Sequence, residues 1–397
     1  MFGLKLLSLI FSVIIIEAVA ETDLKQLAKA NNDVGLALLK TFPPEQNAFF
    51  SPVSIYTALG MAYGAARGET AQQMRDALEY EKAGLTNENV HQSFRSLLQL
   101  LSEGSDEYRL EIANAILSQI GLDLRPEYKD MLQNMYKALH KEINFAGNSV
   151  QAVSEVNNWV KQKTNGKISK LLDELSPRTR MILLNAIYFK GTWKKTFNAN
   201  STKDEPFFNN GINEISVPMM KITEVFPYAS FSDEGFHALE LPYKGEEISM
   251  VILLPERRDG LQQLVNEINA SKLQSIISEL YPIKVNVKLP KFKMEDSKEL
   301  KENLISLGMK DAFNGRADFS GISGKPDLYI SDVLHKAVIE VNEEGSEAAA
   351  VTAVIFLLKA SFPIDRTPEF NVDRPFLFFI RDRRTDMILF GGRVNRL

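Results

Sequence analysis

The segment that decides the fold runs from Glu343 to Ile355 and reads Glu-Glu-Gly-Ser-Glu-Ala-Ala-Ala-Val-Thr-Ala-Val-Ile. Its small side chains bury too little apolar surface to offset the entropy lost when the segment is ordered on its own. Side chains alternate between the two faces of a strand, and one face here carries no charge. That face consists of Ser346, Ala348, Ala350, Thr352, Val354 and Phe356. The pattern predicts a strand that enters a sheet which opens to receive it.

The composition is that of a soluble globular protein. The chain has 397 residues, of which 45% are hydrophobic and 24% charged, with a net charge of -5. This charge gives no indication of a nucleic-acid or anionic-membrane partner. The chain contains no cysteine, which excludes disulfides, thiol catalysis and zinc–thiolate sites.

Residues 1–20 have the pattern of a secretory signal peptide. Lys5 precedes an apolar run from Leu6 to Ile16, and Ala18-Val19-Ala20 forms a small-x-small cleavage site. The run is too short to span a bilayer. We therefore expect a secreted, extracellular chain of residues 21–397 that forms a single domain and does not insert into a membrane. The sequons at Asn200 and Asn269 predict glycosylation, in keeping with that route.

Periodicity predicts helices in the first half of the chain and strands in the second. The helices are expected near residues 24–38, 58–62, 70–78, 90–101, 126–139 and 153–160, with a short one at 304–313. The strands are expected near residues 181–189, 207–218 with a turn at Asn210-Gly211, 237–242, 248–255, 283–290, 376–380 and 387–390. No tandem repeat or Gly/Ser linker divides the chain, so we predict one α+β domain.

Six ordered blocks of sequence resemble the serpin family, and the resemblance covers essentially the whole mature chain. The blocks are Asn47–Ile55, Asn158–Ile168, Leu184–Trp193, Leu289–Phe292, Asp373–Phe378 and Phe390–Val394. The absence of cysteine and the acidic pI are similar to those of secreted arthropod serpins, including salivary serpins of ticks.

The resemblance implies a fold of about nine helices around three β-sheets, with an exposed reactive-centre loop at about residues 343–366. It also implies an inhibitor rather than an enzyme. A serine protease attacks the loop and forms an acyl-enzyme; the cleaved loop then inserts into the main sheet and distorts the trapped protease. The protease is the expected covalent partner, and the chain itself is expected to be a monomer.

The residues at the start of the loop match the hinge of inhibitory family members. This hinge comprises Glu344, Gly345, Ser346, Glu347, Ala348, Ala349 and Ala350. Gly345 can adopt the backbone angles of a sharp bend, and a charge at Ser346 would be costly to bury. The alternative is a non-inhibitory serpin that acts as a carrier, storage protein or chaperone.

Counting from Gly345 as in the family places the reactive bond between Lys359 and Ala360. A lysine fits the acidic primary pocket of trypsin-like proteases. Cleavage after Leu358 would instead favour chymotrypsin-like proteases, and Arg366 lies too far along the loop for a full insertion to end there.

The resemblance also brings together Ser51, Ser54, Asn185 and His335, as a hydrogen-bonded cluster beneath the strands that must part. The four histidines have neither zinc-ligand spacing nor a catalytic motif, so we expect no metal, no cofactor and no enzymatic activity.

A sulfated glycan would need a basic helix face or another basic cluster on the surface. The helix at residues 90–101 carries only His91 and Arg95, which leaves a group at Lys190, Lys194 and Lys195 as a weak glycosaminoglycan candidate. We expect this group, and a second one at Arg381, Arg383 and Arg384, to be solvated surface charge.

Overall fold

The computed structural model describes residues 2–102, 107–346 and 367–397. These residues form ten α-helices and two short 3-10 helices, η1 (Ala199–Ser201) and η2 (Asp311–Phe313). The α-helices are α1 (Phe2–Thr41), α2 (Pro52–Ala65), α3 (Gly68–Ala77), α4 (Val90–Ser102), α5 (Pro126–Tyr136), α6 (Ser149–Lys163), α7 (Leu261–Glu267), α8 (Ala270–Glu279), α9 (Lys301–Ser306) and α10 (Ser320–Ser323). No helix of this part of the chain is long and apolar enough to cross a membrane.

One sheet has six strands in the order β10-β11-β4-β2-β3, with the short β12 paired to β4. Its strands are β2 (Tyr108–Gln119), β3 (Leu139–Ile143), β4 (Met181–Thr192), β10 (Phe292–Glu299), β11 (Asp332–Val341) and β12 (Gly345–Ser346). The central pair, β11 and β4, is parallel, and its register runs from Asp332 opposite Ile182 to Val338 opposite Tyr188.

The other sheet has nine strands in the order β1-β15-β14-β8-β7-β6-β9-β13, with β5 paired to β6. Its strands are β1 (Ala48–Phe50), β5 (Lys203–Asn209), β6 (Asn213–Phe231), β7 (Phe236–Pro242), β8 (Ile248–Pro255), β9 (Tyr281–Pro290), β13 (Glu369–Asn371), β14 (Phe376–Asp382) and β15 (Ile388–Val394). The expected three sheets are thus two hydrogen-bonded sheets in the described residues. The reason is β6, whose first part pairs with β5 and whose last part pairs with β7, so that two groups of strands are continuous.

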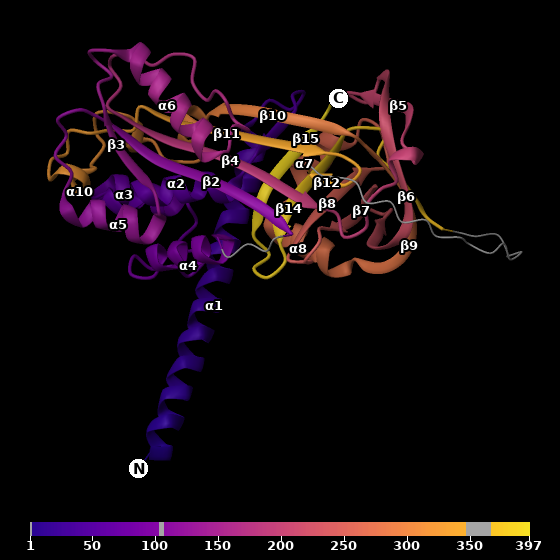
Figure 1. Ribbon diagram of the computed structural model, residues 1–397, viewed down its shortest axis with the longest axis horizontal. Coiled ribbons are helices and arrows are strands. Elements are labelled where there is room, and N and C mark those ends of the chain that lie inside the picture. Colours follow the sequence, from indigo (N-terminus) through magenta and orange to yellow (C-terminus); the bar gives the residue numbers. More distant parts are fainter. Residues whose placement is uncertain (1, 103–106, 347–366) are drawn as a thin grey trace, which may run out of the picture.

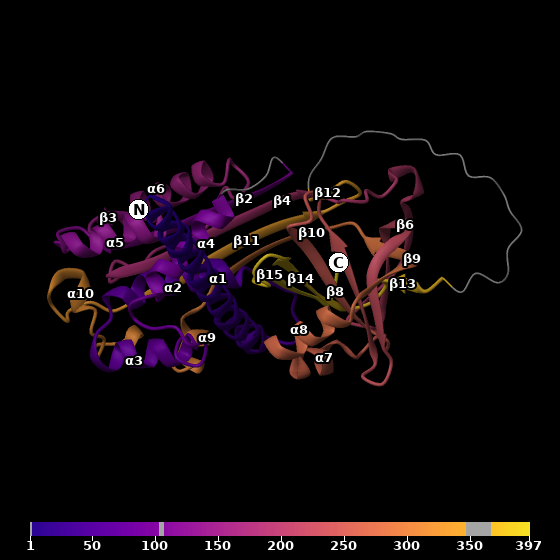
Figure 2. The same ribbon diagram turned by 90° about the horizontal axis from the view of Figure 1, so that it is seen from below.

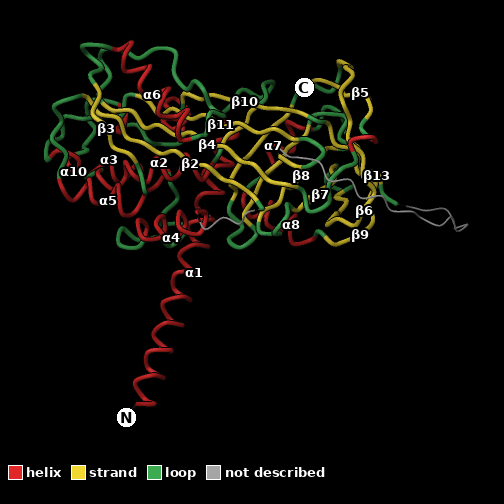
Figure 3. The backbone as a smooth tube through the Cα atoms, in the orientation of Figure 1, coloured by secondary structure: helices red, strands yellow, loops and turns green. Residues whose placement is uncertain are grey.

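The six-stranded sheet lies between two layers of helix (Figures 1 and 2). Helix α6 covers one face, where it forms a small core with β2, β4 and β11, and helices α2–α5 lie on the other face. The main core fills the space between this second face, the helices and the nine-stranded sheet. Figure 3 shows the resulting segregation, with most helices gathered at one end and the nine-stranded sheet at the other.

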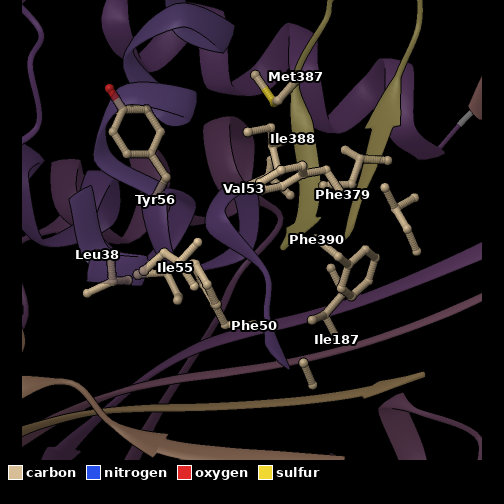
Figure 4. Close-up of a cluster of buried hydrophobic side chains, with 14 of the residues drawn as sticks. Leu38, Phe50, Val53, Ile55, Tyr56, Ile187, Phe379, Met387, Ile388 and Phe390 are labelled. Atoms are coloured by element: carbon tan, nitrogen blue, oxygen red, sulfur yellow. The ribbon is translucent and has the colours of Figure 1, made fainter. Parts of the chain in front are cut away.

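Helix α2 is buried on nearly all sides: thirteen of its fourteen residues are buried. Ser51 caps its N-terminus and Pro52 occupies its first turn, where a missing N–H has no cost. Val53 and Ile55 project into the cluster shown in Figure 4, together with Ile187 of β4 and Phe390 of β15. The helix therefore joins the two sheets.

The predicted elements are largely confirmed, including the turn at Asn210-Gly211, where both residues have positive φ angles. The prediction that the first half is mainly helical is wrong for β2, a 12-residue strand. Most of the second half of β2 is buried on both faces, so its sequence lacks the alternation that identifies a half-exposed strand.

Candidate functional site

The four residues of the predicted cluster meet beneath the centre of the six-stranded sheet. Ser51 and Ser54 lie at the start of α2, Asn185 is in the middle of β4, and His335 is in the middle of β11. All four are 0–1% exposed. His335 and Asn185 are register partners, so the cluster bridges the parallel strand pair at its centre.

The hydrogen bonds of the cluster define the protonation of His335. The backbone N–H of Ser51 donates to Nε2 of His335 over 3.0 Å, so this nitrogen is the acceptor. The proton is therefore on Nδ1, which donates to Oδ1 of Asn185 over 2.5 Å. Nδ2 of Asn185 in turn donates to Oγ of Ser54 and, over 2.5 Å, to Oδ1 of Asn114.

Asn114 is a member of this network that the sequence analysis missed. It lies in β2, opposite Asn185, and is 7% exposed. The Oγ of Ser51 donates to the carbonyl of Leu389 in β15 over 2.6 Å. One network thus connects three strands of the six-stranded sheet to α2 and to the other sheet.

Burial lowers the pKa of His335 to about 3, and the nearby Lys298 acts in the same direction. Both nitrogens of the neutral ring are satisfied, whereas a protonated ring would direct an N–H at the Ser51 amide, which cannot accept it. His335 is therefore neutral in the folded protein at physiological pH.

The predicted hinge begins in the sheet itself. In β12, Gly345 lies opposite Thr192 and Ser346 opposite Gly191, antiparallel to β4. Gly345 has a φ of 138°, and a Cβ placed on it would lie 2.1 Å from the carbonyl oxygen of Gly191. Only glycine allows this close approach of the two backbones.

The chain just before β12 is held by the carboxylate of Glu343. This carboxylate accepts hydrogen bonds from Thr202 over 2.9 Å and from Lys291 over 3.1 Å. The backbone N–H of Phe197 donates to the Glu343 carbonyl over 2.7 Å. Burial raises the pKa of the Glu343 carboxyl, but hydrogen bonding and the charge of Lys291 outweigh it and leave this pKa lowered.

Trp193 and Asn342 complete the hinge, and neither was assigned a role from the sequence. The indole N–H of Trp193 donates to the Asn342 carbonyl over 3.0 Å, and the ring stacks on Tyr243 at a centroid distance of 4.3 Å. Oδ1 of Asn342 accepts from the N–H groups of Glu344 and Gly345. The sequence signal for Trp193 was its place in a family-like block, directly after β4.

The remaining predicted loop residues lie outside the described residues. They are Glu347, Ala348, Ala349, Ala350, Leu358, Lys359, Ala360 and Arg366. The segment that contains them connects β12 in the six-stranded sheet to β13 at the edge of the nine-stranded sheet.

Both predicted glycosylation residues are exposed. Asn200 lies in η1, two residues before Thr202, which contacts the hinge. Asn269 caps the N-terminus of α8, where its side-chain oxygen accepts from the N–H of Lys272 over 2.9 Å.

The two basic clusters differ from each other. Lys194 and Lys195 are surface residues that pair with Glu246 and Glu224. The expectation of solvated charge is wrong for Arg381, which is 7% exposed and bonded to the buried Glu240. Arg381 balances the charge of the Glu240 carboxylate in the core of the nine-stranded sheet, because a buried carboxylate needs a cationic partner.

Comparison with known proteins agrees with this architecture. A family model described as "Serpin (serine protease inhibitor)" matches residues 29–397. Iripin-3 of Ixodes ricinus is 42% identical over 99% of this chain and 100% of its own length. Intracellular coagulation inhibitor 2 of Tachypleus tridentatus is 40% identical over 95% of this chain and 93% of its own length. The crystal structure of uncleaved ovalbumin superposes with a TM-score of 0.83 at 31% identity, covering 94% of this chain and 100% of that one.

The buried neutral His335 makes stability pH-dependent. Its pKa is lowered from 6.5 to about 3, so the unfolded chain binds the proton first as pH falls, and stability decreases from about pH 6.5 down to about pH 3. Between pH 8 and pH 5 we expect His335 to account for a loss of about 2 kcal/mol. Denaturant unfolding at pH 8 and pH 5 measures this loss. Between these pH values the free energy of unfolding of His335→Gln should fall by about 2 kcal/mol less than that of the parent. An equal fall in both proteins would contradict a neutral buried ring.

Substitution of Gly345 should displace the hinge from β4. In a Trp159→Phe background, where Trp193 is the sole tryptophan, we expect Gly345→Ala to red-shift the emission because the indole loses its contact with Asn342. The matched control is Gly235→Ala, which has a positive φ of 74° but no atom within 4 Å of the added Cβ. Identical spectra for the two variants would show that close approach at Gly345 is not required.

Proposed function

The chain belongs to the serpin family, and we propose that it is a secreted suicide-substrate inhibitor of trypsin-like serine proteases. The observation that carries this proposal is the pairing of Gly345 and Ser346 with β4. Gly345 and Ser346 already form the first backbone pairs of a strand beside β4. Strand β4 continues for ten residues beyond these pairs, from Lys190 to Met181.

Continuing the same antiparallel register places the loop along the whole of β4. Residue 348 then lies opposite Phe189, 350 opposite Ile187, 352 opposite Asn185, 354 opposite Leu183 and 356 opposite Met181. All five of these β4 residues are 0–1% exposed. Cross-strand partners share a face, so the uncharged face of the loop meets the face of β4 that lines the main core. The one charge, Glu347, falls opposite the half-exposed Lys190.

Insertion requires β11 to separate from β4. Their parallel ladder would be replaced by two antiparallel ladders, one on each side of the new strand, and antiparallel pairing is slightly more stable per residue. The twelve residues from 345 to 356 would span about 40 Å. Each new backbone hydrogen bond contributes about 1 kcal/mol net, and the two new ladders contain more of these bonds than the single ladder that they replace.

The proposed reactive bond is Lys359-Ala360. A lysine at this position selects proteases whose primary pocket ends in an acid, and the small Ala360 does not obstruct the acyl step. A shift of one residue would place Leu358 there and favour chymotrypsin-like targets. The relatives named coagulation inhibitors favour inhibition over the carrier, storage or chaperone alternative.

We also propose that residues 1–20 are removed as a signal peptide and that Asn200 and Asn269 carry glycans. The exposure of both asparagines supports this, because a sequon must be accessible on the surface to accommodate the sugar. The proposed inhibitor acts as an extracellular monomer. The group of Lys190, Lys194 and Lys195 is the weak candidate site for a glycosaminoglycan.

Incubation with trypsin or plasmin tests the function directly. The expected product is a covalent complex that survives SDS and runs at the summed mass, because the acyl-enzyme is trapped. Lys359→Ala should reduce inhibition of trypsin at least a hundredfold, with Leu358→Ala as the matched control. Plain cleavage without a complex would favour the non-inhibitory alternative, and full activity of Lys359→Ala would place the reactive bond elsewhere.

The proposed register is tested by charges on opposite faces of the loop. Ala348→Glu would bury a carboxylate opposite Phe189, which is 1% exposed, so we expect the protease to cleave this variant without being trapped. Ala349→Glu would lie opposite Tyr188, which is also buried at 6% exposed, but Lys167 lies over the Tyr188 ring at 5.6 Å and can pair with the new carboxylate. We therefore expect this variant to form more complex than Ala348→Glu. The ratio of complex to cleaved product on a gel measures both. The reverse ranking would mean that the strand enters in a register shifted by one residue.

A further inference from the structure

We propose that Asn314 is a site of spontaneous deamidation, at which the folded chain converts an asparagine to aspartate or isoaspartate. The chain has three Asn-Gly dipeptides, at Asn165-Gly166, Asn210-Gly211 and Asn314-Gly315. A glycine after asparagine favours the reaction, because it has no Cβ to shield its nitrogen. The fold places the three dipeptides in different geometries, and the geometry of the third one suits the reaction best.

Deamidation begins when the glycine nitrogen attacks the amide carbon of the asparagine side chain. The glycine N–H gives up its proton to solvent hydroxide, a bond forms between this nitrogen and Cγ, and the bond from Cγ to Nδ2 breaks as ammonia leaves. Water then opens the cyclic imide at either carbonyl, so the net change consumes one water and releases one ammonia. The attack needs a glycine N–H that is free of other hydrogen bonds and lies near the side chain.

The glycine N–H is already bonded at two of the three dipeptides. At the end of α6, the N–H of Gly166 donates to the Lys161 carbonyl over 2.7 Å. In the turn between β5 and β6, the N–H of Gly211 donates to the Phe208 carbonyl over 2.9 Å. Within the described part of the chain, the N–H of Gly315 donates to no acceptor. Gly315 is exposed, so hydroxide has access to this N–H.

The backbone of each asparagine decides where the glycine nitrogen lies. Asn165 and Asn210 have φ angles of 49° and 52°. These lie in the left-handed region, where ψ is about +30 to +60° and the next nitrogen is anti to Cβ, on the far side of the Cα–C bond. Asn314 has a φ of -140° and a ψ of -177°, which places the Gly315 nitrogen gauche to Cβ. A modest rotation therefore brings this nitrogen to Cγ.

The side chain of Asn314 is also held ready for the attack. Its Oδ1 accepts from the backbone N–H of Arg316 over 2.8 Å, and its Nδ2 donates to the Lys310 carbonyl over 2.8 Å. Negative charge develops on Oδ1 as the nitrogen attacks, so the Arg316 N–H stabilises the transition state. The amide is thus preorganised by two hydrogen bonds that leave Cγ open to the glycine nitrogen.

Solvent access alone predicts the opposite order of the three sites. Asn165 and Asn210 are exposed, whereas Asn314 is half-buried. A reaction limited by access of water would run faster at the first two residues. The order of the three rates therefore distinguishes control by local geometry from control by exposure.

The product would weaken the contact between η2 and α3. Gln73 of α3 donates to Oδ2 of Asp311 over 3.2 Å, and Arg316 pairs with Oδ1 at 2.8 Å. The Asp311 carboxylate is 7% exposed, so it depends on these partners. A carboxylate at position 314 adds one negative charge, which changes the net charge from -5 to -6, and competes for Arg316. A buried carboxylate that loses its cation is costly, so we expect the deamidated chain to be less stable.

Ageing of the full-length protein tests the site. The protein is kept in mildly alkaline buffer at physiological temperature and then denatured and digested, and mass spectrometry follows the conversion of amide to acid at each dipeptide. We expect Asn314 to convert at least about tenfold faster than Asn165 and Asn210, since one donor to a developing oxyanion has that effect or more. In denaturant the three rates should be similar. Equal rates in the folded protein, or a faster rate at Asn165 or Asn210, would overturn the proposal.

Gly315→Ala is the matched variant for the chemistry. The added Cβ has no atom within 4 Å, and the φ of Gly315 is outside the left-handed region, so the fold should not change. The methyl group shields the nitrogen, and we expect conversion at Asn314 to slow about tenfold while the rates at Asn165 and Asn210 stay the same. An unchanged rate at Asn314 would exclude attack by the nitrogen of residue 315.

Two substitutions at position 314 test the consequence. Asn314→Asp carries the charge of the product, and Asn314→Ser removes the bond to the Lys310 carbonyl without adding a charge. We expect Asn314→Asp to unfold at a lower denaturant concentration than Asn314→Ser, because only the aspartate competes with Asp311 for Arg316. Equal midpoints for the two variants would show that the new charge does not weaken the contact between η2 and α3.

Discussion

The structure depends on the parallel pairing of β4 and β11 and on the hydrogen bond between His335 and Asn185 at its centre. Each polar atom that this bond satisfies would be costly to leave unpaired in so buried a place. The bond also couples the pair to α2 through Ser51 and Ser54, and through Leu389 to the other sheet. The pair is therefore held at its centre by side-chain hydrogen bonds as well as by its backbone ladder.

In the proposed mechanism, the hinge specifies where the separation of β4 and β11 begins. The close approach of Gly345 to the Gly191 carbonyl fixes the first rung of the new ladder, and Trp193 and Asn342 hold the turn that precedes it. The register of every later rung follows from this one, because the side-chain period of a strand is two. A shift of a single residue would turn the charged face of the loop toward the core.

The two sheets have separate roles in the proposed mechanism. The six-stranded sheet receives the loop and determines what happens to the protease after the attack. The nine-stranded sheet holds the other end of the loop through β13.

The amino-acid sequence alone determined the features that depend on neighbours along the chain. These are the alternating uncharged face of the loop, the helix at residues 58–62 and the turn at Asn210-Gly211, since local periodicity and turn chemistry carry them. The meeting of Ser51, Ser54, Asn185 and His335 came from resemblance to a family, and their spacing gave no signal for it. Only the tertiary structure decided that Asn114 joins Asn185 from 71 residues away and that Arg381 pairs with Glu240 from 141 residues away. Such partners are set by strand order and register, and these are properties of the whole packed molecule that no local pattern contains.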